Sequence, residues 1–261
     1  KQRNIILIED LAHSIGTTYP HNREAGTIGD FTVLSFSQDK MVDGISGGAL
    51  IIRNDNYKNL KFSYPRSDLG NKQQLRDRFY PLFTYVIRKT YSFGLGRLFH
   101  AILKKMNLLS IPMGNHMRDI PHNLPDWYCY LIKQQFDNLD TNLRQRRKIA
   151  SIYIQNIRPA IFSSKMLRNI SLSTHLRFPI LVENRNSLIR YLKRYEIHIS
   201  DIWYDAPIAP EKYMHLTDYT NQCPVAEKIS KQILNLPTHR NVSEEDAQNI
   251  SHRINQWLKS Q

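Results

Sequence analysis

The chain has 261 residues, of which 41% are hydrophobic and 23% charged, and this composition excludes an intrinsically disordered protein. Its formal net charge of +13 leaves nucleic acid, anionic membranes and anionic small substrates open as partners, although the basic residues form no dense block. Cys129 and Cys223 have the spacing of neither a metal site nor a disulfide framework. We therefore expect no metal and a reducing, cytoplasmic compartment.

Three short aliphatic runs near the beginning of the chain predict strands of an α/β sheet. They are residues 5–8, 32–36 and 48–52. Continuous apolar runs of this length are typical of strands that are buried on both faces. Glycine and polar residues fill the links between the runs, and ligands of α/β sheets bind beyond strand ends. The links are therefore the place to look for functional groups.

Residues 72–110 predict one or two amphipathic helices, broken near Gly94. Arg88, Lys89 and Arg97 make the segment too polar to span a membrane, so we expect no transmembrane helix. Two interpretations stay open. The segment can pack against the protein's own core or a partner subunit, or it can make a peripheral contact with a membrane surface.

The rest of the chain predicts a long helix and then a smaller α+β unit. The long helix covers residues 126–157, and Pro159 closes it. Strands at 176–182 and 197–199 then alternate with helices at 187–195, 224–234 and 243–258. We expect two domains: residues 1–125, with a helical insertion at about 72–110, and residues 126–261, formed by the linking helix and a small C-terminal domain.

Lys40 lies between two predicted strands, with Ser35 before it and Gly47–Gly48 after it. A lysine that forms a Schiff base must be held at a strand end or a turn, and a cofactor phosphate needs a nearby hydroxyl group or backbone donors. A pyridine nitrogen needs a carboxylate, which Asp10 can supply, while His13 can reach the other edge of the ring. Simpler interpretations also exist: a carboxylate cap, a packed histidine and a strand-end hydroxyl.

The order of these residues resembles the DegT/StrS group of sugar aminotransferases, which are PLP-dependent enzymes of fold type I. The matching positions are Glu9–Asp10, Ala12–His13, Gly16, Gly29–Asp30, Ser35–Phe36, Lys40 and Gly47–Gly48. Residues 113–119, which include Asn115, resemble the family's Gly-x-Asn-x-Arg loop, and residues 223–239 resemble a late element of the family. The resemblance spans nearly the whole chain in the family's order.

The resemblance implies a fold and a role for each of these residues. The fold is α/β: part of a fold-type-I large domain, with three layers and a mostly parallel sheet, followed by a smaller α+β C-terminal domain. Lys40 holds PLP as the internal aldimine and later moves the proton. Asp10 pairs with the pyridinium nitrogen, and His13 contacts the edge of the ring that carries the hydroxyl group. Ser35 binds the phosphate, and Asn115 reaches a phosphate across a dimer interface.

The activity that the resemblance implies is transfer of an amino group to a nucleotide-linked keto-sugar, in surface-glycan or amino-sugar biosynthesis. Glutamate is the usual amino donor, and the active sites are shared within a homodimer. Some relatives carry histidine in place of the lysine and are dehydratases, so the presence of Lys40 favours transamination. Two alternatives remain: a non-catalytic fragment or relative that acts as an interaction or membrane-surface module, and a nucleic-acid binder. No zinc spacing or helix-turn-helix pattern supports the last one, and we expect no nucleic-acid partner.

The sequence departs from the family's pattern in three places. The family has a stretch before the acid pair, with a glycine-rich phosphate loop, and nothing here matches it. We therefore expect a fragment or a degraded relative that lacks a complete site by itself. The insertion at 72–110 lengthens the distance from Lys40 to Asn115, and we expect it to be dispensable for cofactor binding. Residues 201–213 differ from a substrate loop of the family, which predicts a different sugar.

Overall fold

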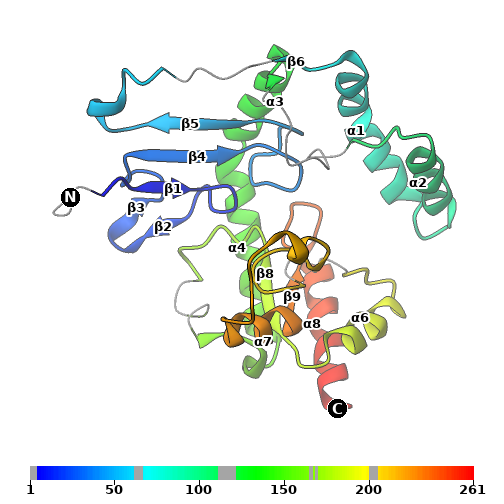
Figure 1. The fold of residues 1–261 in the computed structure, drawn as a ribbon. Coiled ribbons are helices and arrows are strands. Elements are labelled where there is room, and N and C mark those ends of the chain that lie inside the picture. Colours follow the sequence, from blue (N-terminus) through cyan, green and yellow to red (C-terminus); the bar gives the residue numbers. More distant parts are fainter. Residues whose placement is uncertain (1–4, 62–66, 111–121, 165–166, 168–169, 200–204) are drawn as a thin grey trace. The chain divides into compact units, whose positions relative to one another are not determined.

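A computed structural model describes residues 5–61, 67–110, 122–164, 167, 170–199 and 205–261 of the chain. The chain divides into two compact units, Lys1–Leu139 and Asp140–Gln261, and each is described by itself (Figure 1). The first unit contains the predicted site residues, and the second contains a two-stranded sheet covered by helices.

A three-stranded sheet in the order β1-β4-β5 is the centre of the first unit (Figure 1). Its strands are β1 (Ile8–Asp10), β4 (Phe31–Ser35) and β5 (Gly48–Ile52). β1 runs parallel to β4, whereas β5 is antiparallel to β4. The predicted α/β class is confirmed, and this part of the sheet is mixed.

The first aliphatic run differs from its prediction. β1 begins only at Ile8, and the run is exposed, with Ile5 72% accessible to solvent. The reason is local: the Leu7 N–H donates to the Asp30 carboxylate, and the Leu7 carbonyl accepts from the Asp30 and Phe31 N–H groups. These groups tie Leu7 to the turn before β4, so regular pairing of the two strands starts one residue later. The expectation of burial on both faces is wrong for the described residues.

Short elements complete the sheet unit. β2 (Thr18–Tyr19) and β3 (Arg23–Glu24) form a small antiparallel ribbon around a 3-10 turn at Pro20–Asn22, and a second 3-10 turn lies at Asp55–Tyr57. β6 (Ser67–Asp68) pairs in parallel with β7 (His122–Asn123). The pairing of β6 with β7 brings together the residues that flank the predicted insertion.

The segment that the sequence predicts to be an insertion forms two helices, α1 (Asn71–Thr90) and α2 (Leu95–Lys105), which confirms the predicted break near Gly94. Gly94 has φ +79, a conformation that glycine adopts without strain. Gly96 allows the helices to touch, because a Cβ atom there would lie only 2.3 Å from the Ile87 carbonyl oxygen. The Phe83 and Phe99 rings pack edge to face across the same contact. We call α1 and α2 together the helical hairpin.

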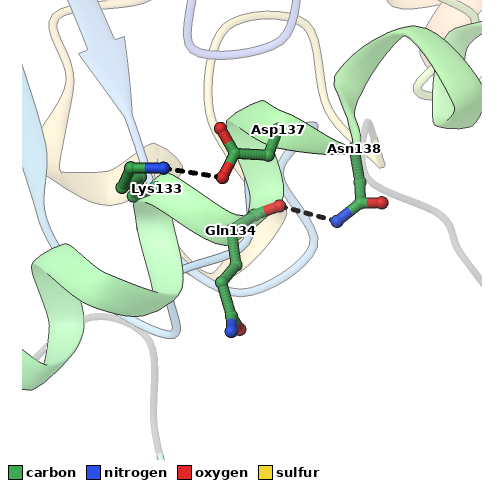
Figure 2. Close-up of polar contacts among 4 residues, drawn as sticks. All are labelled: Lys133, Gln134, Asp137 and Asn138. Carbon is green, nitrogen blue, oxygen red and sulfur yellow. Dashed lines mark hydrogen bonds and ion pairs between the residues drawn. The ribbon is translucent and has the colours of Figure 1, made fainter.

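The predicted helix at 126–157 is divided into α3 (Asp126–Asp137) and α4 (Leu139–Asn156). Figure 2 shows the end of α3, where the Asn138 side-chain amide donates to the Gln134 carbonyl at 2.8 Å and Lys133 pairs with Asp137. Asn138 has φ −100 and ψ 5, outside the helical range. An asparagine that bonds to the preceding turn competes with the helix backbone in this way. The apolar spacing alone did not indicate the break.

The second unit packs its helices on a two-stranded antiparallel sheet, β8 (Phe178–Leu181) with β9 (Ile233–Leu236). The helices are α4, α6 (Arg185–Lys193), α7 (Pro224–Gln232) and α8 (Glu244–Lys259), with 3-10 turns at Pro159–Ile161 and Glu211–Leu216. The fully buried core includes Tyr153, Phe178, Ile180, Leu188, Leu234 and Ile254. Ser243 and Asp246 form the predicted cap of α8.

Two predictions in the second unit are wrong. Residues 197–199 form no strand, because the Ile197 N–H donates to the Leu192 carbonyl and closes the end of α6. The helix predicted at 224–234 ends at Gln232, whose carbonyl accepts from Val182 N–H at the end of β8. Ile233 then has an extended backbone and begins β9. Tertiary pairing with β8 decides the conformation there.

Candidate active site

Four of the five predicted site residues lie at one edge of the three-stranded sheet. β1 and β4 are neighbouring parallel strands, so their carboxyl ends meet at the same edge. Asp10 ends β1 and Ser35 ends β4. His13 lies in the turn after β1, and Lys40 lies in the loop after β4. Asn115 lies outside the described residues, and its predicted role stays a prediction.

The pleat of the sheet places Asp10 and Ser35 on the same face. Asp10 pairs with Val33, and Ser35 follows two residues later on β4, so these side chains share a face. Ile8 and Leu50 share that face through their pairings, and their side chains are exposed together with that of Val33. The result is an open apolar surface with a carboxylate and a hydroxyl group at its edge.

The two acids of the Glu9–Asp10 pair point to opposite faces of the sheet and have different surroundings. Asp10 is exposed, and one of its carboxylate oxygens accepts from the Ala12 N–H at 2.9 Å. This bond caps the turn after β1, which agrees with the simpler interpretation given to Asp10 above. The cap also fixes the direction of the carboxylate at the sheet edge, which a partner for a ring nitrogen needs.

Glu9 has a structural role that the motif did not indicate. Its Oε1 accepts from the Gly26 N–H at 2.8 Å and from the Tyr19 hydroxyl at 3.0 Å. Its Oε2 accepts from the N–H groups of Ile28 at 2.7 Å and Gly29 at 2.6 Å. Burial alone would raise the pKa of Glu9, but these four donors outweigh it and hold the pKa below its ordinary value. Glu9 therefore fixes the loop between β3 and β4 and ties it to Tyr19 of β2.

The loop that carries Lys40, residues 36–47, closes on itself, and we call it the lysine loop. The Phe36 N–H donates to the Gly47 carbonyl at 2.9 Å, and the Phe36 carbonyl accepts from the Gly44 N–H at 2.9 Å. A Cβ atom on Gly44 would lie 2.4 Å from Ile132 of α3, so only glycine fits there. Ile45 has φ +72, a strained conformation for a β-branched residue that occurs mostly at functional sites.

Lys40 itself is half-buried in this loop, and its N–H donates to the Ser37 carbonyl at 3.3 Å. Met41 and Val42, the next two residues, are fully buried and anchor the chain directly after the lysine. The Ser35 and Ser37 hydroxyl groups lie 3.4 Å apart at the beginning of the loop. Lys40 therefore lies in a hydrogen-bonded turn that begins with two serine hydroxyl groups and is followed by buried side chains.

A buried hydrogen-bond network joins the helical hairpin to the lysine loop. Asp77 of α1 is 1% exposed and accepts from the Tyr128 hydroxyl at 2.6 Å, from Gln73 at 2.8 Å and from the Ser110 hydroxyl. Ser110 in turn accepts from Gln38 at 2.6 Å, two residues before the site lysine. One sequence signal could have indicated this: Asp77 is the only acidic residue between positions 70 and 110. The dispensability of the hairpin for cofactor binding stays a prediction, and these contacts show where to test it.

Two titratable groups, one in the lysine loop and one on α1, have shifted pKa values. Burial raises the pKa of Asp43 to about 6, with a further contribution from the Asp39 carboxylate. Burial and the same two carboxylates raise the pKa of Tyr80, on α1, to about 12. One Asp43 carboxylate oxygen accepts from the Ile45 N–H at 2.8 Å. The loop therefore keeps a weakly acidic carboxyl group three residues from the lysine.

The structure also limits the other kinds of site. Over the described ranges, no helix is long and apolar enough to cross a membrane. In the same part of the chain, no group of three or more histidine, cysteine, aspartate or glutamate side chains could hold a metal ion.

Comparison with known proteins identifies the family. The model of the DegT/DnrJ/EryC1/StrS aminotransferase family matches residues 1–255. The chain belongs to this family. The match covers all the motifs quoted from the sequence up to His239, so the resemblance is confirmed.

Two curated relatives and one solved structure show how far the likeness extends. The chain is 22% identical to dTDP-3-amino-3,6-dideoxy-alpha-D-galactopyranose transaminase of Aneurinibacillus thermoaerophilus and 25% identical to GDP-perosamine synthase of Escherichia coli O157:H7. Each match covers 98% of this chain and 59% of the relative. A putative sugar aminotransferase from Streptococcus pneumoniae, solved in its PLP-form, shares the fold with a TM-score of 0.62 and 18% identity, over 98% of this chain and 58% of that chain. The chain thus spans about three fifths of the length of these proteins.

Proposed function

We propose that the parent protein of this chain is a PLP-dependent aminotransferase that transfers an amino group from glutamate to a nucleotide-linked keto-sugar. One observation carries the proposal: Asp10, Ser35 and the hydrogen-bonded loop of Lys40 meet at one edge of the sheet, in a chain of an aminotransferase family. The names of the relatives place dTDP- and GDP-linked sugars among their products. The net charge of +13 suits a diphosphate-bearing substrate. The free thiols of Cys129 and Cys223 suit a cytoplasmic location.

Each residue has a task that its surroundings support. PLP, when bound, supplies an electron sink for a carbanion on the substrate. The Lys40 amine would bind the cofactor's aldehyde carbon and, once released, would carry the proton between substrate atoms. The Asp10 carboxylate would keep the ring nitrogen protonated, and the Ser35 hydroxyl would donate to the phosphate. His13, half-buried after the same turn, would contact the edge of the ring.

We also propose that the site is shared between two subunits, with Asn115 donating to the phosphate held by the partner. A symmetric dimer would then contain two equivalent sites. Mixing inactive Lys40→Ala and Asn115→Ala variants should restore part of the activity, because one of the two sites in a mixed dimer carries neither change. If mixed dimers form and stay inactive, the two residues do not act in one shared site.

We further propose that these 261 residues do not complete the site by themselves, since the relatives are longer and the sheet face beside Asp10 is open. Titration of the 261-residue chain with PLP should give weak binding, and the parent protein should bind at least about tenfold more tightly, as a completed phosphate site would require. Equal affinity of the two proteins would contradict this.

The activity is tested with the parent protein, glutamate and a panel of dTDP-, UDP- and GDP-linked keto-sugars, with release of 2-oxoglutarate as the signal. Lys40→Ala should abolish the signal. Lys58→Ala is the matched control, because Lys58 is an exposed lysine that pairs only locally with Asp55. Asp10→Asn should retain PLP but lose most of the rate, because the ring nitrogen loses its anionic partner. An unchanged rate in Asp10→Asn would remove Asp10 from this role.

A further inference from the structure

The helical hairpin combines exposed apolar side chains with a strong local positive charge. Its basic residues are Lys72, Arg76, Arg78, Arg88, Lys89, Arg97, Lys104 and Lys105. Asp77 is its only acidic residue, and it is buried and engaged with Tyr128 and Ser110. The outer surface of the hairpin therefore presents cations without a compensating acidic side chain from its own sequence.

Each helix carries a continuous exposed apolar stripe. In α2 the stripe is Leu95, which is 62% exposed, together with Leu98 and Ile102. In α1 it is Leu75, which is 56% exposed, together with Phe79 and Leu82. The spacings of three and four residues keep each set on one side of its helix. The hairpin thus has two apolar stripes that its own packing leaves uncovered.

The two stripes face the same side of the hairpin. Phe83 contacts Phe99 and Ile87 contacts Gly96, so the two helices run antiparallel, side by side (Figure 1). A helix turns by about 100° per residue. Around the axis of each helix, the stripe is therefore displaced by roughly a quarter turn from the face that contacts the other helix, in the direction of lower residue numbers. The two contact faces point toward each other and the helices run in opposite directions. The same displacement on each helix therefore places both stripes on the same side of the hairpin. Phe93, 81% exposed at the turn between the helices, adds an aromatic side chain at one end.

We propose that this face of the hairpin docks on an anionic membrane surface. A basic amphipathic structure with aromatic and aliphatic side chains on one face is the type that lies in the interface of a bilayer. The exposed side chains of Lys89 and Lys105 are placed at the borders of the stripes by the helical spacing, where they would meet anionic headgroups. Neither helix is apolar enough to cross the bilayer, so the hairpin lies on it.

Charge favours the membrane over a second copy of the chain. A symmetric contact between two hairpins through this face would bring Lys89 and Lys105 of each copy toward those of the other, while Asp77, the hairpin's acidic residue, is buried in each copy. An anionic bilayer instead neutralises these residues and covers the apolar stripes in one step. The inference is independent of the transaminase activity, and the two can fail separately.

Flotation of the full chain with phosphatidylcholine vesicles, with and without about 30% phosphatidylglycerol, tests the proposal. The chain should float with the anionic vesicles only, and binding should fall as salt rises, because salt screens surface charge. Leu98→Asp with Ile102→Asp, and separately Lys89→Glu with Lys105→Glu, should each lower the bound fraction at least about fivefold. All of these side chains are exposed, so circular dichroism should show an unchanged fold.

The matched controls lie in α7 of the other compact unit. Val225→Asp, and Lys228→Glu with Lys231→Glu, make the same kinds of change at exposed positions and should leave flotation unchanged. Equal binding to neutral and anionic vesicles, no binding to either, or equal losses in the controls would overturn the proposal. Concentration-dependent dimerisation that Leu98→Asp abolishes, without vesicle binding, would assign the face to a second copy instead.

Discussion

Replacing Asp77 with asparagine should loosen the joint between the helical hairpin and the lysine loop. The amide keeps the shape of the side chain and one oxygen, which can still accept from Gln73 and Ser110. Its nitrogen takes the place of the oxygen that accepts from the Tyr128 hydroxyl, and this nitrogen cannot accept a hydrogen bond. The change therefore removes one charge-assisted bond and weakens two others.

The size of the effect follows from these three bonds. A hydrogen bond to a charged group contributes about 1.5–3 kcal/mol, and a neutral one about 0.5–1.5 kcal/mol. The total loss would be about 3–5 kcal/mol if nothing offset it. Burying the Asp77 charge has its own cost, which asparagine avoids, so we expect a net loss of about 2 kcal/mol in the free energy of unfolding.

The assay is urea unfolding of the chain, with the fluorescence of Trp127 as the signal for the first unit. The Trp127 indole N–H donates to Gln74 of α1. A double-mutant cycle that combines Asp77→Asn with Tyr128→Phe gives the coupling between the two side chains. Tyr128→Phe should be costly in the wild-type background and nearly neutral in the Asp77→Asn background, with a coupling energy above about 1 kcal/mol. Asp55→Asn, at an exposed ion pair, is the control and should leave the midpoint unchanged.

Additive costs would refute the reasoning, because two side chains that share a buried bond must couple. The functional readout uses the parent protein, in which Asp77→Asn should weaken PLP binding while Asp55→Asn should not. If Asp77→Asn destabilises the hairpin but leaves PLP affinity unchanged, the network does not position the lysine loop. The segment is then dispensable for the cofactor, as the sequence suggested.

Two further changes test the carboxyl groups near the site. Asp43→Asn keeps the oxygen that accepts from Ile45 and removes a carboxyl group whose pKa is raised to about 6. A raised pKa means that the folded chain holds the proton more tightly, so stability falls as pH rises from about 4 to 6. Paired thermal melts should therefore show Asp43→Asn more stable than wild type at about pH 7.5, by up to about 3 kcal/mol, and no different near pH 4. Glu9→Gln has the opposite sign, because the pKa of Glu9 is lowered and its stabilisation is present above the ordinary pKa and lost as pH falls. At about pH 7 it should cost about 3 kcal/mol, since two of four donors lose their acceptor, and a loss below about 1 kcal/mol would contradict the network.

The sequence predicted most of the regular elements around the site. The aliphatic runs that became β4 and β5 are continuous, and the break near Gly94 is marked by two glycines. The helix break at Asn138 depends on one side-chain bond to Gln134 and left no trace in the apolar spacing. β9 was missed because pairing with β8, far away in the sequence, decides its conformation.

The sequence indicated a set of candidate site residues but not the network of contacts around them. The order Asp10, His13, Ser35 and Lys40 carries the family's signature, and parallel pairing of β1 with β4 brings these residues to one edge. The distinct roles of Glu9 and Asp10 follow from the alternation of a strand that lies beside β4, which an acid pair alone does not indicate. Asp77 is far from Lys40 in the sequence, and only the fold shows that they share a network.

The central claim is that Lys40 is the lysine that binds PLP, and borohydride reduction tests it most directly. The parent protein is loaded with PLP, reduced, digested and mapped by mass spectrometry. The account predicts the reduced pyridoxyl group on Lys40 alone, its loss in Lys40→Ala, and its retention in the control Lys58→Ala. A label on another lysine in the wild-type protein, or a Lys40→Ala variant that is labelled as fully as wild type, would contradict the account.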